Sequence, residues 1–350
     1  MIGDPFSRRS FFRGAALLGA AAAAPIGLSA CAGGSSSGSG GSGQVTIWSV
    51  KDPQHSAQLV YAAETGLFEQ EGLDVEVSYI VNGPDLPSLA ASGEIGLMSA
   101  TVDMVASLRE QNVDFSWLMK LSEISNTQGV VLAADSGISS PAELAGKRMG
   151  MYKGAAVELA VLNMAAANGV DFNAIEFVNL EPPEQMSALL RGDIDAMACW
   201  EPFIGNAVDS GGTKYFTGNR SFITGVETPV DWLYLTTGLT ASAPFMEQSP
   251  EVITAVMRAC LAATEAINAD TPAAATVIAG PLDIPEDQLL PILQANSYDS
   301  VIDQRFVAGW TDYLTWAAAP QQQFLRQSWN PLDLTDFTLF ETLDPDAVQI

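Results

Sequence analysis

The chain of 350 residues is 48% hydrophobic and 16% charged, which is enough to bury a large core and to divide into two lobes. Its 41 acidic residues outnumber 15 basic ones, and the resulting net charge of -26 argues against nucleic acid or anionic lipid headgroups as partners. One histidine and three cysteines show no metal-ligand spacing, so the composition predicts neither a metal site nor a cofactor.

The first 30 residues are typical of an export signal. The arginine pair Arg8-Arg9 precedes an apolar, alanine-rich run that is shorter than the about 20 residues of a membrane span. The stretch Leu28–Cys31 is typical of a lipobox, whose cysteine receives a diacylglycerol chain. The alternative is an ordinary apolar leader that happens to contain a cysteine. We predict a twin-arginine lipoprotein signal over residues 1–30 and lipidation of Cys31.

Residues 32–43 are almost only Gly and Ser, which is typical of a flexible tether. A lipid on Cys31, the tether at 31–43 and a globular body from residue 45 form the layout of an anchored extracytoplasmic protein. We expect it in the periplasm or on the outer face of the cytoplasmic membrane, touching that membrane only through its lipid.

Strand and helix patterns then alternate along the chain. Predicted strands occupy residues 45–50, 73–80, 95–99, 115–121, 129–134, 148–152, 175–180, 194–200 and 232–237. Predicted helices occupy residues 56–67, 86–91, 102–110, 155–168 and 183–191, then a helical region from 250 to about 316. The Pro- and Asp-rich tail from Asn330 is expected to wrap the surface.

This alternation predicts an α/β protein with largely parallel sheets. Ligands of such sheets bind beyond the carboxyl ends of the strands. The predicted site therefore lies in the loops at 49–56, 81–86, 99–103, 152–156 and 200–203.

Three segments carry a family resemblance. Residues 59–75 combine an alanine-rich helix with Gly-Leu-Phe and Glu-Gly-Leu-Asp-Val, and residues 139–150 contain Ser-Pro-Ala-Glu-Leu-Ala-Gly-Lys. Residues 190–202 run from Gly-Asp-Ile-Asp-Ala to Trp-Glu-Pro. Together they resemble the ABC transporter solute-binding proteins of the nitrate/sulfonate/taurine and thiamine-pyrimidine-precursor binding family.

The resemblance implies a two-lobed periplasmic-binding-protein-like (type II) fold, each lobe a mixed sheet flanked by helices, with ligand in the interlobe cleft. We expect crossing segments near 123–128 and 225–232, so that residues 45–127 and 228–350 form lobe one and 128–227 form lobe two. A ligand that contacts both lobes would close the hinge through its extra affinity for the closed form. The implied partners of this monomer are a small molecule and an ABC importer permease.

The segment Lys153-Gly154-Ala155 lies between a predicted strand and a predicted helix. Glycine lets the backbone approach a ligand, and free N–H groups at a helix start attract anions. A tight turn with Lys153 in solvent is equally consistent with this pattern.

Polar residues follow other predicted strands. Ser99 and Thr101 precede a helix, and Gly83 and Asp85 lie in a loop. Thr101 and Asp85 would either cap the next helix or contact the ligand.

The first strand is followed by Asp52 and His55 in the sequence Asp-Pro-Gln-His. This position resembles an N-x-x-H element of pyrimidine-precursor binders, with Asp in place of Asn, so the match is partial. The alternative for an isolated histidine is a surface or capping role.

Aromatic and acidic residues close the second lobe. Trp200 would stack on a ring or cover an alkyl stem, and Glu201 would pair with an amine. The alternatives are packing of Trp200 between the lobes and a hinge role for Glu201. Trp232 is a further candidate aromatic wall, whereas Cys199 and Cys260 are expected in the core.

We therefore expect import of a small organic anion or zwitterion, such as an alkanesulfonate, taurine or nitrate. A thiamine pyrimidine precursor is the close alternative, favoured by His55, Trp200 and Glu201. Two other classes stay open: an enzyme, since eukaryotic pyrimidine synthases share the implied fold, and a sensing partner of a membrane kinase. No dense His/Cys cluster supports the enzyme, so we expect no catalysis.

Overall fold

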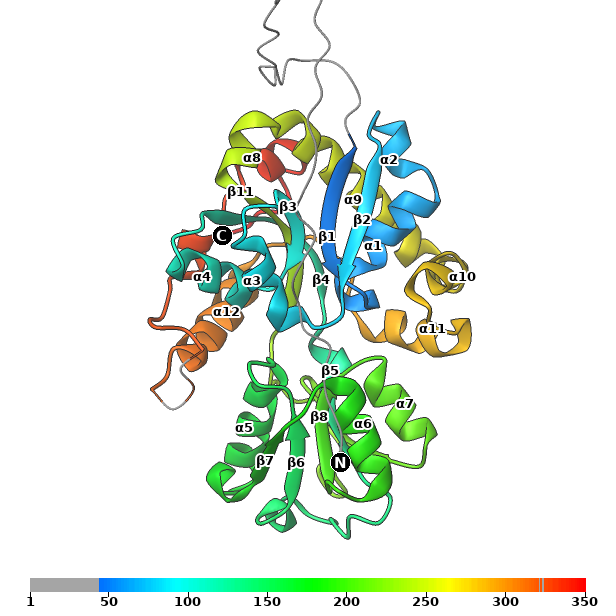
Figure 1. The fold of residues 1–350 in the computed structure, drawn as a ribbon, viewed down its shortest axis with the longest axis vertical. Helices are drawn as coiled ribbons and strands as arrows, with labels where there is room; N and C mark the ends of the chain where they lie inside the picture. Colours follow the sequence, from blue (N-terminus) through cyan, green and yellow to red (C-terminus); the bar gives the residue numbers. More distant parts are fainter. Residues whose placement is uncertain (1–43, 321, 323) are drawn as a thin grey trace, which may run out of the picture. The chain divides into compact units, whose positions relative to one another are not determined.

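The computed structural model describes residues 44–320, 322 and 324–350. The predicted export signal, Cys31 and the Gly/Ser tether lie outside the described residues. The described chain belongs to one compact unit that contains two β-sheets, shown in Figure 1. We call each sheet with its helices a lobe.

The sheet of the first lobe has the strand order β2-β1-β3-β11-β4. Its strands are β1 (Val45–Val50), β2 (Val75–Ile80), β3 (Leu97–Ala100), β4 (Phe115–Glu123) and β11 (Thr236–Ser242). β1 pairs in parallel with β2 and β3, whereas β11 is antiparallel to both β3 and β4. A strand that returns from the other lobe thus completes this sheet.

The sheet of the second lobe has the order β10-β9-β5-β8-β6-β7. Its strands are β5 (Gln128–Leu132), β6 (Arg148–Met151), β7 (Glu176–Asn179), β8 (Ala196–Trp200), β9 (Thr213–Thr217) and β10 (Arg220–Ser221). β6 is parallel to β7 and β8, and the remaining pairs are antiparallel. Both sheets are therefore mixed, as the resemblance implied, and the expectation of largely parallel sheets was wrong.

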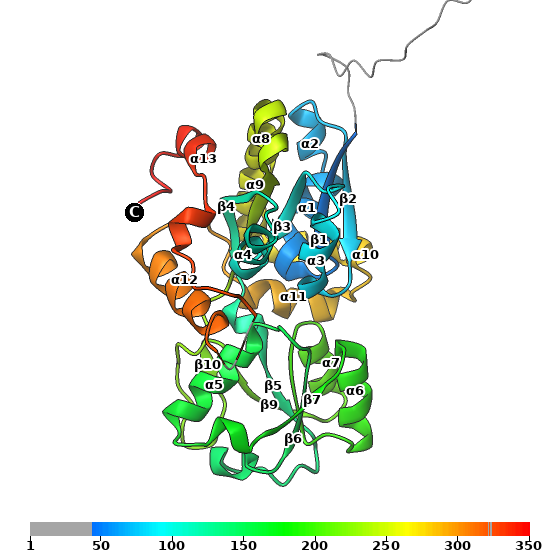
Figure 2. The same cartoon turned by 60° about the vertical axis from the view of Figure 1, so that its left-hand side comes forward.

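Helices cover both sheets (Figures 1 and 2). Those of the first lobe are α1 (Pro53–Glu64), α2 (Leu67–Gln70), α3 (Leu86–Ala90), α4 (Val102–Glu110), α8 (Ala243–Gln248), α9 (Pro250–Ala269), α10 (Thr271–Leu282), α11 (Glu286–Ala295), α12 (Gln304–Ala317) and α13 (Thr338–Leu343). Those of the second lobe are α5 (Val157–Ala167), α6 (Pro182–Arg191) and α7 (Phe203–Asp209). By length and composition α9 could cross a membrane, but its buried face packs in the core like that of a globular protein.

Short 3-10 helices occur in the connecting segments, namely η1 (Gly83–Asp85), η2 (Ser125–Thr127), η3 (Pro141–Leu144), η4 (Phe172–Ala174) and η5 (Pro331–Leu334). The first crossing between the sheets joins β4 to β5, and the second joins β10 to β11. The two crossings run side by side, because the Ile124 N–H donates to the Leu235 carbonyl at 2.8 Å and the Leu235 N–H donates to Ser125 Oγ at 3.0 Å.

Two sequence predictions need correction. The strand predicted at 232–237 begins only at Thr236, because Trp232–Leu235 belong to the second crossing and are buried there rather than in a sheet. The C-terminal tail does not merely wrap the surface: Leu334 and Phe340 are fully buried, and the Asp336 N–H donates to the Trp117 carbonyl at 3.0 Å. The pattern also missed α7, α8, β9 and β10.

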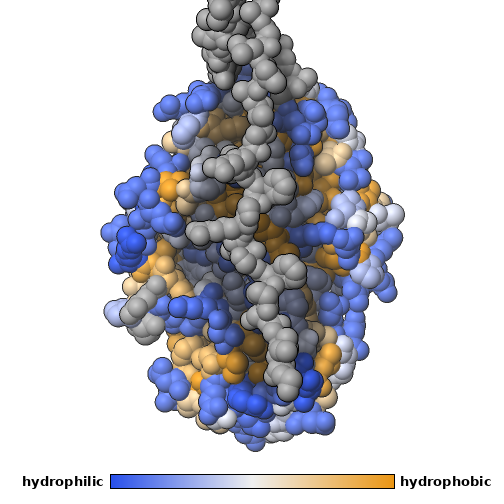
Figure 3. Space-filling model, in the orientation of Figure 1, coloured by the Kyte–Doolittle hydropathy of each residue, from blue (hydrophilic) through white to orange (hydrophobic). Residues whose placement is uncertain are grey.

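The aromatic core of the first lobe explains the position of the tail. The Trp117 ring lies 4.7 Å from that of Trp310 and 6.4 Å from that of Phe337. On the face shown in Figure 3, hydrophilic side chains cover much of the margin, with hydrophobic ones between them. The large hydrophobic side chains exposed among the described residues are Val81, Leu190, Phe222, Val226, Leu332 and Ile350.

Candidate ligand-binding site

One cleft receives residues from both lobes and from the crossings between them. The volume of this cleft, including the solvent at its mouth, is about 460 Å³. It is lined by Asp52, Gln54, His55, Gly83, Pro84, Thr101, Asp103, Met104, Ile124, Gln128, Gly154, Ala155, Ala156, Trp200 and Leu235. Each of the five strand-end loops predicted from the sequence contributes to this lining.

The turn from β1 into α1 supplies the most polar part of the lining. Asp52 caps α1, since its Oδ1 accepts the His55 N–H at 2.8 Å, and Pro53 occupies the first helical position, where no N–H is needed. Ser56 Oγ donates to the Val50 carbonyl at 2.6 Å and fixes the turn from the other side. This local chemistry brings Gln54 and His55 to the cleft.

Burial moves the pKa values of Asp52 and His55 in opposite directions, since it penalises the charged form of each. It raises the pKa of Asp52 to about 7, although the N–H groups of His55 and Gln54 act against the rise. It lowers the pKa of His55 to about 4. Ser99 Oγ lies 3.3 Å from His55 Nδ1, behind the lining, and the Ser99 backbone acts against the fall of this pKa.

Asp103 lies in the first turn of α4, a helix whose N-cap is Thr101. Burial raises the pKa of its carboxyl, and interactions with the hydroxyls of Thr101 and Tyr313 oppose the rise. Asp103 Oδ1 is buried without a hydrogen-bond partner among the described residues. The sequence analysis did not single out Asp103, although it lies in the predicted 99–103 loop.

Gln54 joins the two lobes. Its Nε2 donates to the Glu201 carbonyl at 2.8 Å, and the side chain is only 1% exposed. Its Oε1, like Asp103 Oδ1, has no partner within the described part of the chain. Gln54, in the first turn of α1, and Gln128, at the start of β5, were also missed, because an amide gives no signal in the sequence of the direction in which it points.

The second lobe contributes a backbone turn and one aromatic ring. Gly154 has a φ of +87°, a left-handed conformation that favours glycine, and α5 begins just after Ala156. Trp200 ends β8 and is 7% exposed, with its ring edge-on to Phe203 at 6.5 Å. Lys153 is exposed and lies outside the lining, while its N–H donates to Asn179 Oδ1 at 2.9 Å.

Three other predicted contacts have partners of their own outside the lining. The Glu201 carboxylate accepts the Gly205 N–H at 2.7 Å and lies 3.4 Å from Lys214 Nζ. Asp85 accepts the Tyr152 hydroxyl at 3.2 Å, a bond between the lobes. The Trp232 ring packs edge-on against Phe216 at 5.2 Å.

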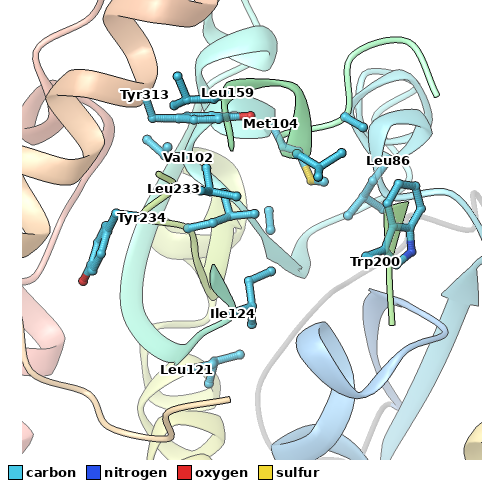
Figure 4. Close-up of a cluster of buried hydrophobic side chains, with 14 of the residues drawn as sticks. Leu86, Val102, Met104, Leu121, Ile124, Leu159, Trp200, Leu233, Tyr234 and Tyr313 are labelled. Carbon is cyan, nitrogen blue, oxygen red and sulfur yellow. The ribbon is translucent and has the colours of Figure 1, made fainter. Parts of the chain in front are cut away.

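The remaining predicted contacts, Asp52, His55, Gly83, Thr101, Gly154, Ala155 and Trp200, line the cleft together. Its apolar surroundings join the two lobes in one buried cluster, and Figure 4 shows Met104, Ile124 and Leu86 of the first lobe in the same region as Leu159 and Trp200 of the second. Ligand in this cleft would touch both lobes.

Lysine and arginine are absent from the residues that line the cleft. Among the described residues there is also no group of His, Cys, Asp and Glu that could hold a metal ion. Cys199 and Cys260 are free and buried in the core, and burial raises the pKa of the Cys260 thiol to about 12. The lining of the cleft is therefore mainly apolar, and its ionisable side chains are two carboxyls and one neutral imidazole.

A family model described as NMT1/THI5 like matches residues 52–275, more than half of the chain. The chain belongs to the NMT1/THI5-like family. This confirms the family resemblance predicted from the sequence.

Two curated relatives of this NMT1/THI5-like protein differ in how far they align. The taurine-binding periplasmic protein of Escherichia coli K12 is 23% identical over 290 residues, which cover 81% of this chain and 87% of that protein. The formylaminopyrimidine-binding protein of Halalkalibacterium halodurans is 29% identical over 140 residues, or 40% of this chain and 42% of that protein.

Solved structures confirm the fold. The alkanesulfonate-binding protein of Xanthomonas axonopodis pv. citri bound to MOPS has a TM-score of 0.68 at 18% identity, covering 84% of this chain and 98% of that one. A desulfurization enzyme has a TM-score of 0.61 at 14% identity, and the match covers 86% of this chain and 99% of that one. The NMT1/THI5-like chain thus has the type II periplasmic-binding-protein fold, which hosts binding proteins and at least one enzyme.

Proposed function

We propose that this NMT1/THI5-like protein is an extracytoplasmic solute-binding protein that delivers a small molecule to an ABC importer. The observation that carries the proposal is a cleft to which both lobes and all five predicted strand-end loops contribute. A taurine-binding periplasmic protein aligns with most of the chain, which supports the same role here.

Hinge closure is the proposed mechanism. We propose residues 45–127 and 228–350 as one lobe and 128–227 as the other, moving about the paired crossings at Ile124 and Leu235. A ligand that bridges Asp52 or His55 to Gly154 or Trp200 has more contacts in the closed form, so it shifts the population toward closure. The importer permease would then recognise the closed protein.

The proposed ligand contacts are the predicted residues that line the cleft, namely Asp52, His55, Gly83, Thr101, Gly154, Ala155 and Trp200. A small organic anion or zwitterion of the sulfonate or taurine type is supported by the turn at Gly154, ahead of the first turn of α5. A pyrimidine precursor of thiamine is supported by the Trp200 ring and the neutral His55.

An enzyme of this fold is a weaker proposal. A desulfurization enzyme shares the fold, but both described cysteines of this chain are buried outside the cleft. Nucleophilic catalysis needs a nucleophile within reach of a base, and Cys199 and Cys260 meet no substrate in this position.

The proposed anchoring rests on the N-terminal sequence. A lipid on Cys31 would hold the protein at the outer face of the cytoplasmic membrane or in the periplasm, and a monomer would serve the importer. Labelling of cells with a radioactive fatty acid tests this directly: the wild-type protein should incorporate the label, and Cys31→Ala should not.

A ligand panel tests the binding function. The full chain is titrated with taurine, alkanesulfonates, nitrate, formylaminopyrimidine and amino acids while its melting temperature is recorded. A ligand at 100 times its dissociation constant stabilises the folded state by about 2.7 kcal/mol, which is visible as a rise in melting temperature. Trp200→Ala should remove most of that rise, measured against the variant's own ligand-free melting temperature, which falls because the ring is buried. Turnover of any solute, rather than binding, would contradict the proposal.

A further inference from the structure

Two buried oxygen atoms of the cleft lack the hydrogen bonds that buried acceptors normally make. Gln54 is 1% exposed, and because its Nε2 is committed to the Glu201 carbonyl, the amide orientation is fixed and Oε1 remains the free acceptor. Asp103 Oδ1 is the second free acceptor. A buried polar atom without a partner destabilises the fold, so such atoms are rare unless a ligand or water completes them.

The ionisable side chains around these two oxygens are two carboxyls and one imidazole. On the first lobe α1 presents Asp52 and the neutral His55, and α4 presents Asp103. The second lobe presents the backbone of 154–156 and the Trp200 ring, and the crossings present Ile124, Gln128 and Leu235.

Cationic side chains lie outside the lining: Lys153, next to the turn at Gly154, is exposed. Lys214 pairs with Glu201 at 3.4 Å, and Lys120 pairs with Asp299. An anionic group placed beside Asp103 Oδ1 would offer this acceptor no hydrogen and would meet no lysine or arginine among the lining residues.

We propose that the ligand carries an N–H donor group, an ammonium or an amino group, which donates to Asp103 Oδ1 and Gln54 Oε1 on the first lobe. This inference rests on the proposed function, because it takes the cleft to be the solute site. It selects among the candidate solutes: taurine and an aminopyrimidine carry such a group, whereas nitrate and unsubstituted alkanesulfonates do not.

Gln54 also links this group to the closure of the lobes. An N–H bound at Oε1 polarises the amide and strengthens the bond from Nε2 to the Glu201 carbonyl of the second lobe. The donor group of the ligand thus reinforces a contact between the lobes without touching the second lobe itself.

Matched solutes test the inference. Isothermal titration of the full chain is carried out with taurine and with isethionate, which replaces the ammonium by a hydroxyl, and with 4-aminopyrimidine and 4-methylpyrimidine. We expect at least one N–H-bearing probe to bind at least tenfold more tightly than its partner. Equal or tighter binding of the amine-free partners would overturn the inference and leave the receptor function standing. If neither these probes nor the wider panel binds, the proposed function fails as well.

A variant provides a second test, and its melting-temperature readout needs no ligand. Asp103→Asn keeps the size of the side chain but replaces the carboxyl group, whose Oδ1 has no hydrogen-bond partner among the described residues, by a neutral amide. We expect the ligand-free melting temperature to stay level or rise, and any N–H-bearing probe to bind at least tenfold more weakly. The matched control Asp74→Asn changes an exposed carboxylate away from the cleft and should alter neither quantity. A fall of several degrees for Asp103→Asn alone would mark its carboxylate as structural and overturn the inference.

Discussion

Asp52 is the N-cap of α1 and His55 lies in the first turn of that helix, and folding shifts their proton affinities in opposite directions. The pKa of Asp52 rises from 3.8 to about 7, so its contribution makes the free energy of unfolding fall as pH increases across that window. The pKa of His55 falls from 6.5 to about 4, so its contribution makes the free energy of unfolding fall as pH decreases from 6.5 to 4. Between pH 4 and 6.5 the two contributions oppose each other.

We predict that Asp52→Asn exposes the His55 contribution. Asparagine keeps an N-cap acceptor but does not titrate. Between pH 4 and 6.5 the free energy of unfolding of the variant should increase by about 3 kcal/mol more than that of the wild type, at about 1.4 kcal/mol per pKa unit. Urea denaturation at several pH values measures the difference. Asp74→Asn should follow the wild type, and parallel curves for Asp52→Asn and wild type would refute the assigned titration.

Single residues also show where sequence reasoning reaches its limit. The loops that form the site were predicted from the positions of the strand ends. Of the contacts predicted in them, His55, Thr101 and Trp200 line the cleft. Glu201 stands beside Trp200 in the chain, yet its carboxylate accepts the Gly205 N–H in the first turn of α7. A helix that the pattern missed thus determines where Glu201 points. Gln54 and Asp103 were missed because side-chain direction depends on the helix register that each cap establishes.

Elements far apart in sequence complete the first lobe. β11 returns through the second crossing and inserts between β3 and β4, and the C-terminal tail then packs on the Trp117 side of β4. Local periodicity predicts most strands and helices within a few residues, because those depend on nearest neighbours along the chain. It does not predict that Pro- and Asp-rich residues after 330 carry core side chains, since their burial arises only from tertiary packing.

The tail should therefore contribute strongly to stability. We predict that Phe340→Ala in α13 lowers the free energy of unfolding by about 3 to 5 kcal/mol, because a fully buried ring leaves a cavity. Leu332→Ala, in the same tail but 41% exposed, should change it by less than about 1 kcal/mol. Chemical denaturation of both variants gives the comparison. Similar values for the two would mean that the tail is not part of the cooperative core.

At the scale of the whole molecule, hydrogen bonds join the two lobes at different places around the cleft. Gln54 bonds to the Glu201 carbonyl near the crossings, and the Tyr152 hydroxyl donates to Asp85 at 3.2 Å. The site is thus bounded by contacts that exist only when the lobes are together. In the proposed hinge mechanism, such contacts set the population of the closed form before any ligand binds, and this population multiplies the apparent affinity.

Tyr152→Phe isolates the Tyr152–Asp85 contact, because it removes one hydroxyl and keeps the ring. A hydrogen bond contributes about 0.5–1.5 kcal/mol, so the closed population and the apparent affinity should fall by about two- to tenfold. Titration calorimetry with a binding solute from the panel measures the affinity, and small-angle scattering of the ligand-free protein should show a larger radius of gyration. Tyr61→Phe, a change in α1 outside the cleft lining, serves as the control and should bind like the wild type. An unchanged affinity for Tyr152→Phe would mean that this bond does not hold the lobes together, and closure would then depend on Gln54 and the ligand.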